Sequence, residues 1–206
     1  MRIFYFLLAG LLIIAAPASA QIYVGGEVGV NLSTYTGKLG GNNRTPRVGE
    51  TAGFILSKDI TWHLSLMTGV TYVRNGYNVL YHGLSYKVGI NTFEVPLNLE
   101  CQIGRTKKQN YFIGGGPYVA MNAFGRTVLS GPFPTNQDLR VGLGAGDDIK
   151  RYDAGLSVWF VFQPTKGLFF RARAQSGLFN LDPTRYAKDN PMINRDFRLT
   201  AGYMFE

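Results

Sequence analysis

The segment FRLTAGYMF, residues 197–205, alternates between two kinds of side chain along its whole length. Every second residue is apolar, and the apolar set is Phe197, Leu199, Ala201, Tyr203 and Phe205. Successive side chains of a β-strand point to opposite faces, so the segment predicts a strand with one apolar face. Apolar side chains facing outward, polar ones facing inward and aromatic residues at the ends are typical of strands in transmembrane β-barrels.

The other end of the chain carries an export signal. Arg2 precedes an apolar run over residues 3–16, and Ala18-Ser19-Ala20 follows it. The run is too short for a membrane helix, and no stop-transfer pattern comes after it. We therefore predict a signal peptide over residues 1–20, cleaved after Ala20, and a single outer-membrane barrel domain over residues 21–206.

Alternation of the same kind recurs between clusters of turn residues, and it predicts eight strands. An apolar parity that reverses near Asn91 predicts a bulge there, and bulges are also expected at Pro96 and Pro117, which lack a donor for the ladder. The predicted strands cover residues 22–32, 49–57, 61–74, 85–104, 111–124, 151–163, 168–178 and a closing strand through 197–205.

Short and long connections alternate along the chain. Residues 58–60, 105–110 and 164–167 form brief links, whereas 33–48, 75–84, 125–150 and 179–195 form long ones. This asymmetry predicts an all-β, antiparallel up-and-down transmembrane barrel with short periplasmic turns, long extracellular loops and both termini in the periplasm. Eight strands leave an interior that side chains fill, which argues against a general porin.

The composition limits the classes of molecule that the chain is expected to bind. The chain has 21 Lys and Arg residues against 13 Asp and Glu, a formal net charge of +8. These cations are scattered and form no basic cluster or helix, so we expect no nucleic-acid binding. Outer-membrane lipid and lipopolysaccharide, which is anionic, are the expected surroundings. The lone cysteine, Cys101, excludes a disulfide framework.

Charged residues fall on the inward parity of several strands. Isolated charges in a narrow barrel would be unfavourable, so we expect them to pair and to close the lumen. The alternative is a narrow ion path or a gate. The acidic members are Glu27, Glu94, Glu100, Asp153 and Asp196, and the basic members are Lys87, Arg151, Arg171, Arg173 and Arg198.

No catalytic, cofactor or metal site is predicted. His63 and Ser65 have the spacing of a histidine that activates a serine, but they fall at the periplasmic end on the inward parity, away from outer-leaflet lipid A. The run Gly114 to Gly116 lies in a strand without a following helix, so it indicates room for Tyr118 or Trp159 rather than a phosphate loop. The glycine-rich stretch 142–148 occurs once and indicates a loop.

Several segments together resemble the PorT-like outer-membrane β-barrel family of Bacteroidota-type Gram-negative bacteria. FEVPLNLECQIG at 93–104 and YFIGGGPYV at 111–119 resemble its paired "leiPl" and "Gpy" strands. GVNLS at 29–33, YDAGL at 152–156 and SGLFNL at 176–181 are similar to its opening strand, "fdfGl" start and "yGLtnl" end.

The resemblance implies an eight-stranded barrel, with some relatives in type IX secretion and gliding, and it supplies no catalytic residues. Our leading hypothesis is a non-catalytic structural or interaction barrel whose extracellular loops, especially 125–150, bind a secretion-machinery protein, another surface protein or a glycan. A narrow pore or transporter for small solutes is the second hypothesis. A lipid A-modifying enzyme is the third and weakest.

Overall fold

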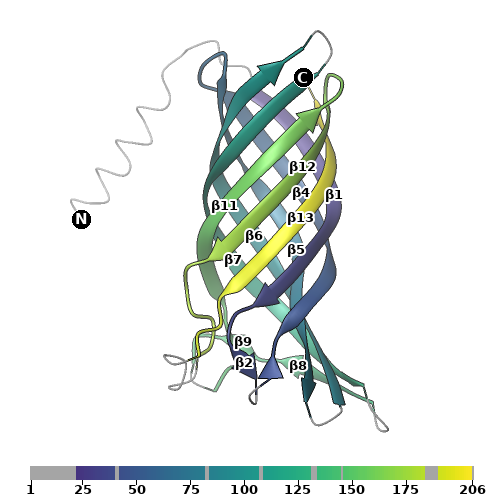
Figure 1. Cartoon of the computed structure of the whole chain (residues 1–206). Helices are drawn as coiled ribbons and strands as arrows, with labels where there is room; N and C mark the ends of the chain where they lie inside the picture. Colours follow the sequence, from purple (N-terminus) through teal and green to yellow (C-terminus); the bar gives the residue numbers. More distant parts are fainter. Residues whose placement is uncertain are drawn as a thin grey trace, which may run out of the picture.

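A computed structural model describes residues 22–39, 42–81, 84–106, 109–130, 134–144, 146–183 and 190–205. The predicted signal peptide lies outside these residues. Within them, the chain forms one closed antiparallel barrel in which strands adjacent in the sequence are neighbours in space (Figure 1). No helix in the described ranges is long and apolar enough to cross a bilayer.

The strands of the ring match the eight that the alternation predicts. Each pairs with the next, and β13 pairs with β1 to close the ring, so its backbone ladder has no open edge. The ring consists of β1 (Ile22–Tyr35), β4 (Thr45–Asp59), β5 (Leu64–Tyr81), β6 (Leu84–Arg105), β7 (Asn110–Ser130), β11 (Tyr152–Gln163), β12 (Leu168–Gly177) and β13 (Asn194–Phe205).

The wall of the barrel is apolar outside and polar inside. Val28, for example, pairs with Ala201 and Ala52 on the outer surface, while its neighbour Glu27 is buried in the lumen. We call the outward-facing band the apolar belt. Its outward side chains come from residues 24–32 of β1, 52–56 of β4, 66–72 of β5, 93–103 of β6, 113–124 of β7, 152–162 of β11, 168–174 of β12 and 197–205 of β13.

The two ends of the barrel differ in height. At the turn end, short links join the strands, and Val24 near the start of β1 pairs with Phe205 at the end of β13. At the loop end, β5, β6 and β7 run well past the belt, and β8 (Thr135–Leu139) adds to the edge of β7. These four strands form a ledge on one side of the mouth (Figure 1).

The ledge corrects part of the loop assignment. Residues 75–84, predicted as a loop, are mostly the tip of the β5–β6 hairpin, and β7 extends the predicted strand to Ser130. The register of β6 and β7 shifts between Asn91 and Thr92, but the extra residue, Ala123, lies on β7, and β6 keeps its register with β5. Val88 and Ile90 therefore share the inward parity of Thr92 and Glu94, so the reversal of parity predicted for this strand is wrong.

Smaller features complete the loop end, and the prolines differ from expectation. Pro96 pairs with Tyr118, and Pro117 pairs with Leu156, without a register shift at either proline, so the predicted bulges there are wrong. On the side of Pro96 that faces β5, the Thr68 hydroxyl donates a hydrogen bond to the Pro96 carbonyl.

The remaining short strands are β2 (Lys38–Leu39), β3 (Asn42–Asn43), β9 (Val141–Gly142) and β10 (Ile149–Lys150).

Candidate functional site: the lumen

The first ion cluster in the lumen centres on Arg171 of β12. Its Nη1 lies 2.6 Å from Oε2 of Glu27, and both side chains are almost completely buried. Thr200 donates a hydrogen bond of 2.9 Å to the same carboxylate oxygen. On the turn side, Arg171 Nη2 lies 3.9 Å from Glu100, which accepts a 2.8 Å bond from the Trp159 indole. One guanidinium therefore links β1, β6 and β12 across the lumen.

The second ion cluster centres on Arg198 of β13. Its guanidinium lies 2.7 Å from Glu94 and 2.9 Å from Asp196. The side chain of Arg198 is 2% exposed, and that of Asp196 is fully buried. Gln175 donates a further 2.9 Å bond to Glu94. Buried ions need such saturation, because removal of one partner leaves an uncompensated charge. We call the two clusters and the residues between them the charged layer.

Arg173 lies between the clusters and has no carboxylate partner within ion-pair distance among the described residues. It pairs in register with Arg198, an unfavourable like-charge neighbour. Its guanidinium instead lies 5.0 Å from the centre of the Trp159 ring. The aromatic face attracts the cation, so Trp159, which also contacts Glu100, connects Arg173 to the first ion cluster.

Three predicted members of the network lie elsewhere. Asp153 is buried but contacts the Tyr118 hydroxyl, at 3.5 Å, rather than a cation. Lys87 and Arg151 are exposed, so their predicted position in the lumen is wrong. Lys87 has the outward parity of Phe93 on the same strand. Arg151 lies before β11 begins and donates a hydrogen bond to the Val141 carbonyl.

Glycine makes room for the aromatic part of the layer. A Cβ placed on Gly114 would lie 2.5 Å from the Trp159 ring, and one on Gly155 would lie 2.5 Å from the Tyr118 hydroxyl. The run 114–116 thus accommodates Trp159, as its position in a strand predicts. Phe169 adds a second ring, 4.9 Å from the Arg171 guanidinium. Side chains therefore fill the middle of the lumen.

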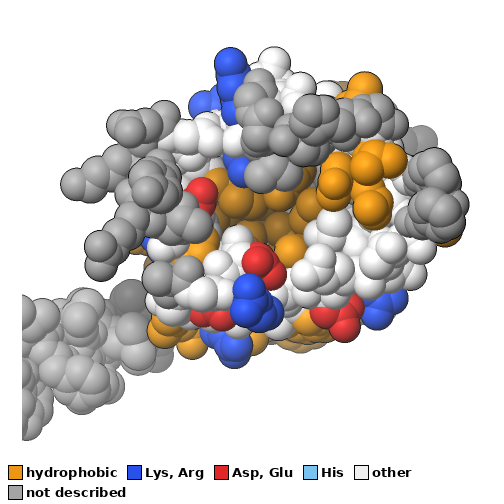
Figure 2. All heavy atoms as spheres, turned by 90° about the horizontal axis from the view of Figure 1, so that it is seen from below, with side chains coloured by type: hydrophobic (Ala, Val, Ile, Leu, Met, Phe, Trp, Pro, Cys, Tyr) orange, Lys and Arg blue, Asp and Glu red, His pale blue; other side chains and the backbone are white. Residues whose placement is uncertain are grey.

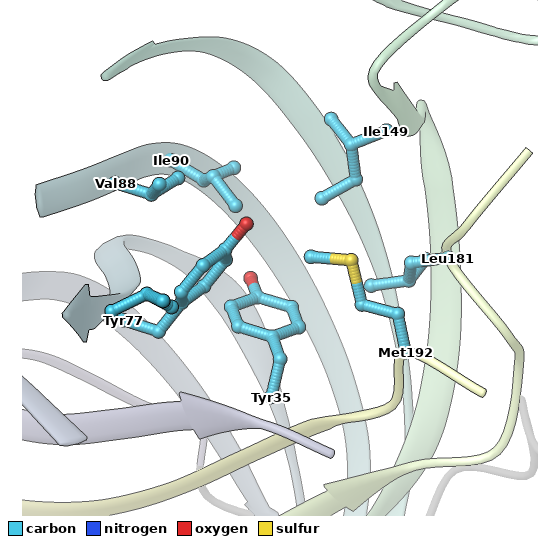
Figure 3. Close-up of a cluster of buried hydrophobic side chains, with 8 residues drawn as sticks. Tyr35, Tyr77, Val88, Ile90, Ile149, Leu181 and Met192 are labelled. Carbon is cyan, nitrogen blue, oxygen red and sulfur yellow. The ribbon is translucent and has the colours of Figure 1, made fainter. Parts of the chain in front are cut away.

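A second closure lies at the loop end, which we call the hydrophobic cap. Tyr35 and Tyr77 meet edge to face with ring centres 5.5 Å apart, and Met192 and Leu181 approach them from the opposite side (Figure 3). Burial raises the pKa of both tyrosines, so they stay neutral. The buried members are Tyr35, Tyr77, Val79, Val88, Ile90, Ile149, Leu181 and Met192.

Backbone hydrogen bonds hold the cap together. The Lys150 amide donates to the Leu181 carbonyl at 2.9 Å, and the Leu181 amide donates to the Met192 carbonyl at 2.8 Å. Segments far apart in the sequence thus cross the mouth and pack on the inner face of the ledge. Seen from this end, the mouth is hollowed and its floor is hydrophobic (Figure 2).

The cap was not predicted. Tyr77, Val88 and Ile90 carry the required alternation, but the turn residues around Asn75 and Gly76 led to a loop assignment. Ile149, Leu181 and Met192 have no strand periodicity, since they come from irregular segments. The one usable signal is that the apolar Val88 and Ile90 share the inward parity of Thr92 and Glu94.

The turn end opens into a cavity of about 470 Å³ that reaches inward to Arg171. His63 and Ser65 both line this cavity. They therefore lie at the turn end and face inward, as their position and parity on the strand predict. Ser65 donates a 2.6 Å hydrogen bond to Asp59, so its hydroxyl proton is committed to a carboxylate and not to the histidine. In the described ranges, no group of three His, Cys, Asp or Glu residues is arranged for a metal ion.

Comparison with known proteins identifies a family model for an outer membrane protein beta-barrel domain, which matches residues 17–182. Among solved structures, the chain is similar to Ail, the attachment invasion locus protein of Yersinia pestis, at 11% identity over 89% of this chain and 98% of that chain, with a TM-score of 0.48. Neisserial surface protein A is similar at 10% identity over 90% and 99%, with a TM-score of 0.46. No curated protein matches. The narrower PorT-like resemblance stays a prediction.

Proposed function

We propose a function from the premise that this chain belongs to the outer membrane protein beta-barrel domain family, whose model matches residues 17–182. It is an outer-membrane β-barrel protein. We infer that its lumen does not conduct and that it acts as a non-catalytic structural or interaction barrel. In this proposal the loop end faces the outside, the termini face the periplasm, and the loop end binds a partner.

The observation that carries the proposal is the closure of the lumen at two levels. The charged layer fills the middle with paired ions, and the hydrophobic cap covers the loop end. A permeating ion would have to separate Arg198 from two carboxylates, and separation of buried ion pairs is strongly unfavourable. Motion of a single side chain cannot open both levels.

Planar lipid bilayers test the closure. Purified mature protein is expected to insert without producing stable, reproducible channel openings. A general porin inserted under the same conditions is the positive control. If wild-type protein conducts steadily at a single unitary conductance, the non-conducting proposal is wrong.

The partner-binding part of the proposal rests on the loop end. The ledge projects past the belt, and its edge strand β8 is mostly exposed. Leu80 of β5, on the same ledge, is 65% exposed. An exposed strand edge presents unpaired backbone groups that can pair with another chain. The segment 125–150, expected to be a binding loop, contributes most of this edge. We further propose that this partner belongs to a protein-secretion machinery.

Affinity purification from detergent-solubilised outer membrane tests the partner. We expect a specific protein to co-purify with the native chain and to be lost when Gln137→Pro breaks the β8 edge. Gly146→Pro, which changes another part of the loop end, is the control. Ser176→Pro would be unsuitable because Ser176 lies within the ring of strands. Secretion-machinery subunits in the eluate would support the secretion link. Repeated recovery of the barrel alone would contradict partner binding.

A narrow transporter is the second candidate, because the barrel has a hollow at each end, the turn-end cavity and the mouth. Solute uptake into liposomes distinguishes this reading, since transport that disappears when the charged layer is cross-linked would favour it. The lipid A-modifying alternative is weaker because Ser65 is bonded to Asp59. An unchanged lipid A mass spectrum in overproducing cells would end it.

A further inference from the structure

The outer wall carries cations where the apolar belt ends. On β4, β5, β6 and β7, the first outward residues past the belt at the loop end are polar: Glu50, Arg74, Asn91 and Arg126. Farther toward the loop end, Lys87 of β6 is exposed, and Arg47 of β4 is half-buried beside Val48, which is 68% exposed. These positions line the level at which a barrel in a bilayer meets the lipid headgroups.

Arg47 lies flat against the wall over two glycines. A Cβ on Gly76 would lie 3.1 Å from Arg47 Cδ, and a Cβ on Gly89 would lie 3.1 Å from Arg47 Nη1. The register of β4 and β5 shifts between Pro46 and Thr51, which frees this part of β4 to lean over the neighbouring hairpin. The bare backbone at these two glycines leaves room for the Arg47 side chain to lie close against the wall.

The cations of this patch are incompletely neutralised. Arg74 pairs with Glu50 at 3.0 Å, and Arg126 pairs with Asp138 at 3.1 Å. Lys87 has no ion pair within the described residues, and Nη1 of Arg47 is buried without a hydrogen-bond partner. Gly89, beneath Arg47, pairs with Arg126, so these cations are adjacent.

An apolar groove adjoins the patch on the same wall. The floor of this groove is formed by Gly26, Ala52 and Ala201, whose small side chains leave a depression among larger neighbours on the outer wall. Phe54, Tyr72 and Phe93 stand along its sides. Ala52, Tyr72 and Phe93 are partners in register, and each lies one pleat below Glu50, Arg74 and Asn91 respectively. The groove therefore leads directly to the cationic patch.

The geometry points to a binding site for one phosphorylated outer-membrane glycolipid, with its phosphate on Arg47 and Lys87 and an acyl chain in the groove over Ala52. Both halves are required by the same ligand, because the patch selects an anion and the groove selects a hydrocarbon chain beside it. Guanidinium and ammonium groups are the usual protein partners of phosphate. The site uses the outer wall alone and does not depend on whether the lumen conducts.

Native mass spectrometry of the detergent-purified mature chain tests the site, with diphosphoryl lipid A as the probe. Wild-type protein is expected to bind one copy preferentially, and the double variant R47Q/K87Q is expected to bind about tenfold more weakly. K58Q/R105Q removes the same charge from the turn end and should bind like wild type. Equal binding of fully dephosphorylated lipid A, or equal loss in both double variants, overturns the phosphate contact.

The groove has its own variant. Ala52→Phe fills the depression from outside the lumen and is expected to weaken binding about tenfold, while Ala174→Phe on the opposite wall should not. Both variants add an outward apolar ring, so folding should be equally unaffected, which heat-modifiable migration in gels verifies. If Ala52→Phe binds like wild type, the acyl part of the proposal is wrong, whatever the charge variants show. Partner capture and conductance are separate measurements, so failure of the proposed function would be recognised independently.

Discussion

The charged layer and the hydrophobic cap close the same lumen with opposite chemistry. In the layer, the 2% exposed side chain of Arg198 contacts two carboxylates, and in the cap the 1% exposed Leu181 packs on apolar side chains. The layer depends on the pairing of Arg171 and Arg198 with carboxylates, and the cap depends on filling volume. We therefore expect single substitutions in the layer to fail by leaving a buried charge, and those in the cap to fail by leaving a cavity.

The largest effect is expected from Arg198→Met. This change leaves Glu94 and Asp196 buried together without their cation, and loss of one partner of a buried pair typically reduces the free energy of unfolding by about 3–5 kcal/mol. Urea unfolding in detergent micelles, followed by Trp fluorescence, measures it. Trp159 reports from the layer, because its indole contacts Glu100.

A compensated variant separates charge from size. Arg198→Met combined with Glu94→Gln and Asp196→Asn removes both orphaned carboxylates and is expected to recover more than half of the loss. A triple variant no more stable than Arg198→Met alone would show that packing, and not charge pairing, dominates the layer.

Next in size is Leu181→Ala in the cap. Burial of this side chain predicts a loss of about 2–3 kcal/mol when it is truncated, through lost transfer energy and a cavity. The loss should be local, so limited proteolysis of the loop end should accelerate while the ring of strands stays folded. Leu178→Ala is the matched control, because Leu178 is 64% exposed. Equal proteolysis of the two variants would contradict a packed cap.

The contrast between layer and cap also explains what the sequence could predict. Glu27, Glu94, Arg171 and Arg198 are placed by strand parity alone, since a period of two fixes which residues face inward. Parity cannot choose partners, so it did not separate Asp153, which bonds to Tyr118, from the carboxylates that bind arginine.

Apolar residues on an inward face mislead parity, as does the end of a strand. Lys87 has the outward parity of Phe93 and Val95, and only the predicted reversal at Asn91, which β6 does not make, places it inside. The cap lies beyond the reach of periodicity, because Leu181 and Met192 are brought together by tertiary hydrogen bonds between irregular segments. Strand parity is a local signal and predicts the charged layer. The cap depends on contacts between segments far apart in the sequence, which parity does not report.

A third substitution tests volume inside the charged layer itself. Gly114→Ala would place a methyl group 2.5 Å from the Trp159 ring, and such overpacking typically destabilises by about 1–3 kcal/mol. Trp fluorescence should shift as the indole moves from Glu100. Gly146→Ala has no atom within 4 Å of the new methyl and should leave stability unchanged. An unshifted spectrum for Gly114→Ala would mean that the layer, unlike the cap, tolerates added volume.

The smallest effect is expected for a surface ion pair whose length is close to that of a pair in the charged layer. Arg126 and Asp138 lie 3.1 Å apart, close to the 2.9 Å of Arg198 and Asp196, but their side chains are 63% and 81% exposed. Water screens exposed pairs, which contribute about 0–1 kcal/mol and less at high salt. Asp138→Asn should therefore change the free energy of unfolding by under about 1 kcal/mol, with no difference left in 1 M salt, whereas the loss in Arg198→Met should persist there. A loss in Asp138→Asn as large as that in Arg198→Met would show that contact distance, and not burial, sets the strength of ion pairs in this barrel.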